Sequence, residues 1–150
     1  MKPLIVTAAL VRHEGRILIT RRPDGKAHGG KWEFPGGKLE DDESPQDCLK
    51  RELHEELALQ VEVGDIFTVV YHRYPPGAIL LLVYNCRPLS LRMEDIEVSA
   101  HAWVTPEELS GYEFPEADDV IVARLQHGQN RRNVLIISAT CRSSPSCPSG

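Results

Sequence analysis

The sequence predicts an α/β fold in which helices cover both faces of a β-sheet, and two observations carry this prediction. Residues 45–57 have the spacing of an amphipathic helix, because Leu49, Leu53 and Leu57 fall on one side at about 100° per residue. Residues 78–86 form a continuous apolar run, which is typical of a strand that is buried on both faces. A sheet that contains such a strand needs a helix layer on each side, so the predicted architecture is an α/β/α sandwich.

Strand-like segments and turns occupy the part of the chain before this helix. Three segments have the composition of strands, and they cover residues 4–11, 17–20 and 32–35. His13-Glu14-Gly15 is a turn that joins the first two segments as a hairpin, and a basic, glycine-containing loop follows over 21–31. After the third segment, Gly36 and Gly37 allow the backbone to approach a bound ion or phosphate without a Cβ in the way.

The helix over 45–57 has a defined start in the sequence. Ser44 is suited to be its N-cap, Pro45 occupies the first helical position and Asp47 the third. Four segments after the helix are strand-like, and they cover residues 60–63, 66–73, 78–86 and 98–104. The turn Tyr74-Pro75-Pro76-Gly77 separates the second of these segments from the third.

Two more helices are expected toward the C-terminus. Thr105-Pro106-Glu107-Glu108 is a second capping pattern, and it opens a short helix that ends at Gly111. We expect Asp118 or Asp119 to cap a last helix over 120–126, which stops near Gly128.

Three glutamates form an acidic sector next to the apolar stripe of the helix over 45–57. Glu52 and Glu56 are four residues apart, and such a like-charge pair costs a helix about 0.2–0.5 kcal/mol. A divalent cation reverses this effect, because Mg²⁺ or Mn²⁺ prefers carboxylate oxygens and keeps positions for water and substrate phosphates. The alternative is a solvated acidic face that Lys50 and Arg51 balance.

Composition limits the classes of function. The chain has 150 residues, 41% of them hydrophobic and 26% charged, which is ordinary for one globular domain. It has no apolar run of membrane-spanning length and no cleavable signal pattern, so we expect a soluble cytoplasmic protein. A net charge of −5 argues against binding to duplex nucleic acid and requires that an anionic substrate be neutralised locally.

The four cysteines lack the paired spacing of a zinc site, and we interpret Cys48 and Cys86 as core thiols. The composition changes after Gly128, and Ser, Pro and Cys dominate from Cys141 onward. We therefore expect a folded domain over 1–128 and a C-terminal tail over 129–150 that is partly disordered.

The acidic helix is part of a longer pattern that resembles the signature of the Nudix hydrolases. The pattern is Gly, five residues, Glu, seven residues, then Arg-Glu-apolar-any-Glu-Glu, and it is filled in register by Gly37, Glu43, Arg51, Glu52, Leu53, Glu55 and Glu56. The resemblance extends through most of residues 4–126, to the MutT-like branch and its CTP pyrophosphohydrolase relatives. Its further segments are Arg21-Arg22, 32–37 and 114–118.

The resemblance implies a Nudix α/β/α sandwich with a mixed sheet. One position departs from the family, which usually carries Gly where Ala58 follows the helix. The left-handed C-cap expected there must be strained, shifted or replaced, and the cost should fall on stability.

The resemblance also implies an activity and a set of site residues. These enzymes cleave nucleoside triphosphates to the monophosphate and pyrophosphate using Mg²⁺, for which Mn²⁺ can substitute. The implied metal ligands are Glu52, Glu55, Glu56 and the Gly36 carbonyl. The implied catalytic residues are Glu52, Glu55 and Arg51: Glu52 is our candidate for the general base, and Arg51 orients the glutamates by salt bridges. Glu97 is either a further ligand or a surface residue.

Base recognition is expected to depend on Asp118. The substrate-binding residues that the resemblance implies are Arg22, His28, Glu33, Phe34, Pro35, Gly36 and Asp118. Relatives that hydrolyse 8-oxo-dGTP carry Asn where Asp118 stands, whereas CTP-type relatives resemble this chain in having Asp. Ionised Asp accepts a hydrogen bond from an exocyclic amine, which favours cytosine-type bases, and a protonated Asp remains compatible with oxoguanine. The alternative role for Asp118 is a helix cap.

One cation of the MutT pattern is missing. That pattern has an Arg on the hairpin near Gly77-Ala78, so Arg22, His28 or Arg73 would have to hold phosphate or base here.

Two classes of function remain open at this point. The first is a Mg²⁺-dependent nucleoside triphosphate pyrophosphohydrolase that acts on (d)CTP-type nucleotides or on oxidised purine nucleotides such as 8-oxo-dGTP, and so sanitises the nucleotide pool. The second is a non-catalytic module that recognises a nucleotide or damaged base, and an ADP-ribose-type diphosphatase is a further option among enzymes. The intact acidic set favours an enzyme. The expected partner is a small nucleotide, with no duplex and no membrane, and the protein is expected to be a monomer or homodimer.

Overall fold

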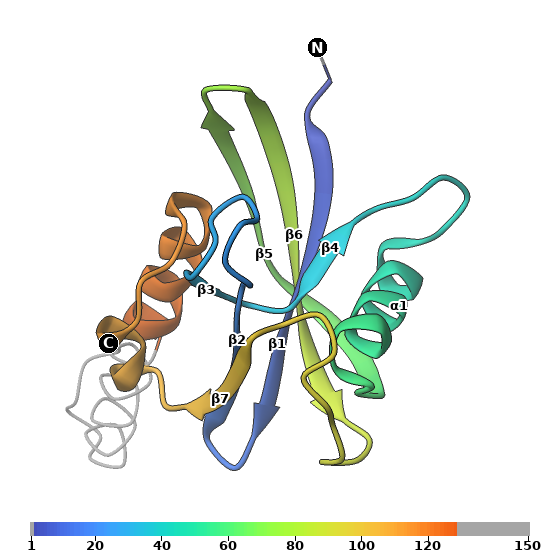
Figure 1. The fold of residues 1–150 in the computed structure, drawn as a ribbon, viewed down its shortest axis with the longest axis vertical. Coiled ribbons are helices and arrows are strands. Elements are labelled where there is room, and N and C mark those ends of the chain that lie inside the picture. Colours follow the sequence, from blue (N-terminus) through green and yellow to red (C-terminus); the bar gives the residue numbers. More distant parts are fainter. Residues whose placement is uncertain (1, 129–150) are drawn as a thin grey trace, which may run out of the picture.

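The computed structural model of the protein describes residues 2–128, and the expectation for the tail over 129–150 lies outside these residues. The elements in chain order are β1 (Leu4–His13), β2 (Arg16–Arg21), β3 (Trp32–Glu33), β4 (Gly36–Lys38), α1 (Pro45–Leu57), β5 (Val61–Tyr74), β6 (Gly77–Pro88), β7 (Ala100–Val104) and the 3₁₀ helix η1 (Glu107–Gly111). A last helix, orange and unlabelled in Figure 1, covers residues 116–128. None of the helices in this part of the chain is long and apolar enough to cross a membrane.

The strands form a mixed sheet, as expected. Its main path has the order β3-β2-β1-β6-β5, with β4 paired to β1 and β7 paired to β2. Strands β1 and β6 run parallel, and the other pairings are antiparallel. β1 pairs with β4 through Val6, Thr7 and Ala8 and with β2 through Arg12 and His13, so it connects the two halves of the sheet.

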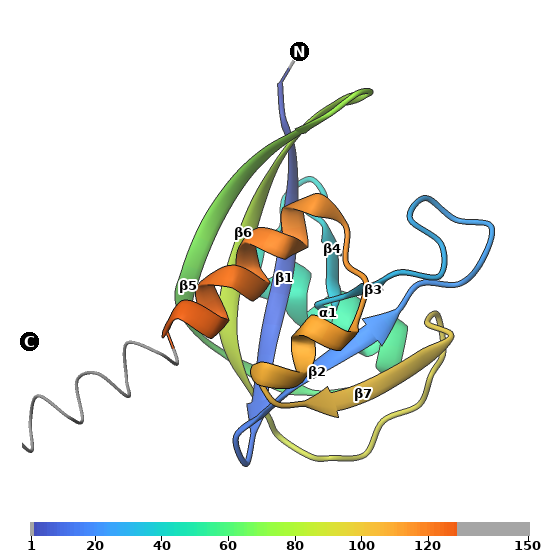
Figure 2. The same ribbon diagram turned by 90° about the vertical axis from the view of Figure 1, so that its left-hand side faces the viewer.

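Helices cover both faces of this sheet, which confirms the predicted α/β/α sandwich. Helix α1 lies on one face, whereas η1 and helix 116–128 lie on the other (Figures 1 and 2). The residues of β1 alternate between two cores: Ala8 and Leu10 pack under helix 116–128, and Ala9 and Val11 pack under α1. This double burial explains why the strand sequences are apolar without a gap.

Helix α1 starts as its sequence predicts and ends in a strained residue. The Ser44 hydroxyl accepts a hydrogen bond from the Asp47 N–H at 3.1 Å, which confirms the N-cap. At the other end, Ala58 has φ 52° and ψ 26°, and its N–H donates to the His54 carbonyl at 2.9 Å. Of the three alternatives for Ala58, the strained left-handed cap is the one observed, at a cost of about 1 kcal/mol.

Most strand boundaries differ from the sequence prediction by one or two residues, and three of the differences change how the strands are divided or where they begin. The expected strands 60–63 and 66–73 are one strand, β5, whose register shifts at two places between Val63 and Thr68, so that bulges absorb the irregular residues. The expected strand 32–35 stops at Glu33, and Gly36–Lys38 forms a separate strand on β1. The expected strand 98–104 begins only at Ala100.

The predicted start of the last helix is wrong. The Pro115 carbonyl accepts hydrogen bonds from the N–H groups of Asp118 and Asp119, at 3.0 and 3.1 Å. The helix therefore begins at 116, with Pro115 in the N-cap position and Asp118 inside the first turn. The capping pattern at Thr105 is confirmed, because Thr105 and Glu108 bond reciprocally from side chain to backbone, but the short helix that it opens is 3₁₀.

Candidate active site

The site begins where α1 packs against β4. A Cβ at Gly36 would lie 2.1 Å from the carbonyl oxygen of Thr7, and a Cβ at Gly37 would lie 2.2 Å from Oε2 of Glu52. Gly36 therefore allows β4 to pair closely with β1, and Gly37 allows the Glu52 carboxylate to lie directly against the β4 backbone. The two glycines bring the acidic helix face and the backbone of β4 into contact.

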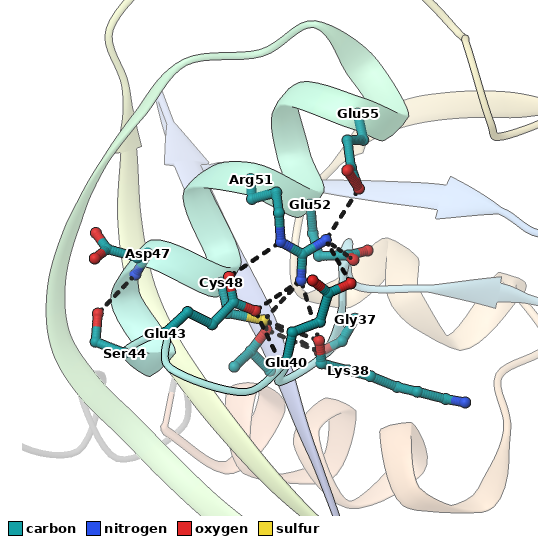
Figure 3. A network of polar contacts seen from close by, with 11 residues as sticks. Gly37, Lys38, Glu40, Glu43, Ser44, Asp47, Cys48, Arg51, Glu52 and Glu55 are labelled. Carbon is teal, nitrogen blue, oxygen red and sulfur yellow. Dashed lines mark hydrogen bonds and ion pairs between the residues drawn. The ribbon is translucent and has the colours of Figure 1, made fainter.

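Arg51 organises the glutamates on the outer side of this contact (Figure 3). Its guanidinium donates to both oxygens of Glu43, at 2.8 and 3.1 Å, to Glu52 at 2.7 Å and to Glu55 at 3.0 Å. It also donates to the Lys38 carbonyl at 3.2 Å, which ties α1 to β4. The hydrogen bonds that Glu43 accepts from Arg51 and from the Glu40 backbone N–H lower the pKa of Glu43 to about 2. In return, Glu43 raises the pKa of Arg51.

Glu56 lies on the inner side of α1 in a different environment. Only 7% of the residue is exposed, and its Oε2 has no hydrogen-bond partner among the described residues. Burial raises its pKa to about 9, with further contributions from the charge of Glu33 and from the hydrogen bond and charge of Glu52. A buried carboxylate oxygen without a donor is costly unless a proton or a cation satisfies it.

These residues fit a divalent cation only in part. Within residues 2–128, no three His, Cys, Asp or Glu side chains already converge as a metal site. Glu52 and Glu56 face each other, but Glu55 is turned outward to Arg51 and its side chain is 44% exposed. The orphaned oxygen of Glu56 and the carboxylate of Glu52 against β4 are the hard oxygen donors that Mg²⁺ prefers.

Two cavities meet at β4. The acidic cleft has a volume of about 330 Å³, and its wall contains Glu52, Glu56 and Glu97 together with Lys26 and Lys38. The apolar cavity, of about 300 Å³, lies between the sheet and the start of helix 116–128. Both are lined by Arg22, Glu33, Gly36, Gly37 and Lys38. A ligand with an anionic part and a flat, less polar part therefore has adjoining spaces for each.

Arg22 and Glu33 form an ion pair where the two cavities join. Nη1 of Arg22 lies 3.2 Å from both carboxylate oxygens of Glu33, and Nε donates to the Ala27 carbonyl at 2.7 Å. Burial nevertheless raises the pKa of Glu33, against the effect of Arg22. The guanidinium is thus anchored at one edge, and its remaining surface faces the cavities.

Asp118 lines the apolar cavity from the first turn of helix 116–128. The Phe34 N–H donates a hydrogen bond to its carboxylate. Burial raises the pKa of Asp118 well above its usual range, and the charge of Glu33 adds to this shift. The Phe34 ring itself stacks on Phe114 with 5.4 Å between ring centroids, so Phe34 contributes mainly its backbone to the polar part of the cavity.

The remaining residues predicted to bind substrate lie in different places. His28 lines the apolar cavity, with a left-handed backbone (φ 58°) and a pKa lowered by burial and by the nearby Lys31 and Arg22. Pro35 is buried, and its carbonyl accepts from the Ala9 N–H at 2.8 Å, so it supports the sheet. Arg73 lies beside a third cavity, of about 570 Å³, next to the β5–β6 turn, and donates to the Tyr71 hydroxyl at 3.2 Å.

Tyr74 and Lys38 line the cavities although the sequence did not predict them as site residues. Tyr74 lines the apolar cavity and accepts a hydrogen bond from the Ala117 N–H at 3.0 Å, whereas the sequence predicted only that it is part of a turn. A tyrosine at the end of an apolar strand can indicate a polar contact in the fold, since its hydroxyl normally finds a hydrogen-bond partner when the ring is buried. The cysteine predictions are confirmed, because Cys48 and Cys86 are both buried free thiols.

Comparison with known proteins places this geometry in a family. A family model described as the NUDIX domain matches residues 6–124. The chain is 36% identical over 119 residues to the CTP pyrophosphohydrolase of Escherichia coli, which covers 79% of this chain and 87% of the relative. It is 30% identical over 125 residues to the 8-oxo-dGTP diphosphatase of Haemophilus influenzae, covering 83% and 92% of the two chains.

Solved structures agree with the sequence relatives. The solution structure of the E. coli ORF135 protein is similar with a TM-score of 0.73 and 30% identity, covering 88% of this chain and 94% of that one. The crystal structure of a MutT protein from Methanosarcina mazei has a TM-score of 0.76 at 28% identity, covering 85% and 96%. The likeness covers more than four fifths of this chain, so the fold is shared.

Proposed function

Because this chain belongs to the Nudix hydrolase family, we propose that it hydrolyses nucleoside triphosphates to the monophosphate and pyrophosphate with Mg²⁺, which Mn²⁺ can replace. The observation that carries the proposal is Glu56, whose buried carboxylate has an oxygen that no described residue satisfies, next to a second carboxylate. A cation at this position would remove that deficit and neutralise phosphate oxygens. The names of two relatives, a CTP pyrophosphohydrolase and an 8-oxo-dGTP diphosphatase, support a nucleotide substrate.

We assign the cation to Glu52, Glu56 and the Gly36 carbonyl, and Glu55 would complete the acidic set by leaving its ion pair with Arg51. When bound, it would polarise the phosphate oxygens and lower the pKa of the attacking water. Glu52 accepts the proton of that water or orients it, because Arg51 holds one carboxylate oxygen and the other lies against β4. Arg51 holds the outer glutamates in place by hydrogen bonds and lowers the pKa of Glu43.

The apolar cavity is our candidate for the base. Its polar groups include the carboxylate of Asp118, the Arg22–Glu33 pair and His28. Ionised Asp118 accepts from the amino group of cytosine, and protonated Asp118 also donates, which suits an oxidised purine such as 8-oxo-dGTP. We therefore propose (d)CTP-type or oxidised purine nucleotides as substrates, and a role in sanitising the cytoplasmic nucleotide pool.

The test is pyrophosphate release from CTP, dCTP, 5-methyl-dCTP, dGTP and 8-oxo-dGTP, with ADP-ribose as the diphosphate comparison. Release from at least one triphosphate that stops when a chelator removes the metal supports the proposal. Nucleotide binding without release from any substrate would make the protein a recognition module. Cleavage of ADP-ribose alone would make it a diphosphatase.

A further inference from the structure

Tyr74 connects the three walls of the apolar cavity. It is the last residue of β5, and its hydroxyl accepts a hydrogen bond from the N–H of Ala117, 43 positions along the chain, at 3.0 Å. Its ring lies against His28 of the loop over 21–31, with 5.2 Å between ring centroids. Sheet, loop and helix start therefore meet at one side chain.

The hydrogen bond between Tyr74 and Ala117 satisfies an N–H group at the start of helix 116–128. The first N–H groups of a helix have no intrahelical acceptor, and a Ser, Thr, Asp or Asn cap usually satisfies one of them. Pro115 occupies the cap position here, and its side chain has no acceptor atom. The hydroxyl of Tyr74 takes the place of that cap from across the cavity.

Asp118 follows Ala117 directly, so a change at this hydrogen bond reaches the residue assigned to the base. Ala117 is 1% exposed, and its N–H cannot reach water unless the start of the helix moves. A second contact strengthens the same connection: Nε2 of His72 lies 3.0 Å from a carboxylate oxygen of Glu116, and the His72 and Tyr74 rings are 4.6 Å apart.

We propose that Tyr74 is a positioning residue for base discrimination: its hydroxyl holds the start of helix 116–128, and with it Asp118, against β5 and the loop over 21–31. The inference rests on the proposed function for its substrate class. It assigns Tyr74 no part in the hydrolytic step, which belongs to α1 and β4 on the other side of Gly36.

Tyr74→Phe tests the proposal, because it keeps the ring against His28 and removes only the acceptor for Ala117. Tyr71→Phe is the matched control on the same strand, since Tyr71 is 57% exposed and its hydroxyl contacts Arg73. For Tyr74→Phe we expect the ratio of kcat/KM for CTP over UTP to fall about tenfold, the size of effect that an unsatisfied buried donor produces. The loss should appear in KM, with kcat at saturating CTP within about twofold of wild type.

If oxidised purines are the better substrates, the ratio of kcat/KM for 8-oxo-dGTP over dGTP is measured instead. Tyr71→Phe should have the wild-type ratio for either pair of substrates. An unchanged base ratio in Tyr74→Phe, or an equal loss of kcat for both bases with KM unchanged, would overturn the proposal. If wild type hydrolyses no triphosphate, the proposed function fails separately. Tyr74 is then judged by the calorimetric affinity for CMP, where equal binding by Tyr74→Phe and wild type overturns the inference.

Discussion

The acidic cleft and the apolar cavity share a wall but are built from the chain in different ways. Glu40, Glu52 and Glu56 of the cleft come from one short stretch, in which β4, a loop and α1 contact each other directly, and Arg22, Lys26, Glu33 and Glu97 complete the wall. The apolar cavity draws on β1, the loop over 21–31, the end of β5 and helix 116–128. The cleft therefore has a local sequence pattern, whereas the cavity depends on long-range packing.

The carboxyl groups of the two regions also have different electrostatic surroundings. Beside the cleft, on the outer side of α1, Arg51 faces four glutamates within 4 Å and lowers the pKa of Glu43 to about 2. In the cavity, burial raises the pKa values of Asp118 and Glu33, although Arg22 acts on both carboxyl groups in the opposite direction. The Arg51 network on the outer side of α1 therefore keeps Glu43 charged, whereas burial favours the protonated forms of Glu33 and Asp118, and of Glu56 inside the cleft.

The largest expected effect is on the hydrolytic step. Glu52→Gln should reduce kcat about 10²-fold or more, because it removes a proton acceptor next to β4, while CMP affinity changes little. The control is Glu62→Gln, an exposed glutamate that pairs with Arg87 on β5 and β6. Near-normal turnover by Glu52→Gln would show that the chemistry does not take place in the acidic cleft.

The stability of the metal-free protein should depend on pH through Glu56. Its folded pKa, about 9, lies above the value of 4.5 for an exposed Glu, so the stabilising protonated form is complete below about pH 4.5 and is lost as pH rises to 9. The slope is on the order of 1 kcal/mol per pH unit. Glu33 and Asp118 shift in the same direction, so the difference between wild type and Glu56→Gln isolates Glu56.

The matching measurement is the melting temperature with Mg²⁺ and with chelator at pH 5 and pH 9. Mg²⁺ should raise the melting temperature of wild type more at pH 9, because at low pH it competes with the proton on Glu56. Equal stabilisation at both pH values, or the same response in Glu56→Gln, would exclude Glu56 from the metal site.

In the apolar cavity, Asp118→Asn should change the preference for bases and leave the chemistry intact. If the carboxylate accepts a hydrogen bond from the cytosine amino group, kcat/KM for cytosine nucleotides should fall. The fall should correspond to a loss of about 1–3 kcal/mol in transition-state stabilisation. Hydrolysis of 8-oxo-dGTP should suffer less, since Asn both donates and accepts. Both substrates are measured on both proteins at fixed Mg²⁺, and a uniform loss would mean that Asp118 supports only the helix.

The smallest effect is expected outside both cavities. Ala58→Gly should relieve the left-handed strain at the end of α1 and stabilise the protein by about 1 kcal/mol, offset in part by the greater freedom of Gly when unfolded. Chemical denaturation measures this change, and kcat should remain that of wild type because the residue contacts neither cavity. A lower stability would mean that the strain at Ala58 is balanced by packing.

The sequence alone determined the parts of this protein in which neighbouring residues interact. The spacing of Leu49, Leu53 and Leu57 predicted α1, Ser44 predicted its start, and the continuous apolar strands predicted helix layers on both faces, because periodicity and capping act within a few residues. The acidic set could also be recognised, since its members lie on one helix and the loop before it.

Only the tertiary structure decided how the apolar cavity is built. The sequence could not show that Pro115 starts the last helix, that Tyr74 caps it from a distant strand, or that burial raises the pKa of Asp118. Each of these depends on residues from separate segments meeting in space, and no local pattern records such a meeting. Likewise, the outward turn of Glu55 follows from the competition of several carboxylates for Arg51, which only the folded geometry resolves.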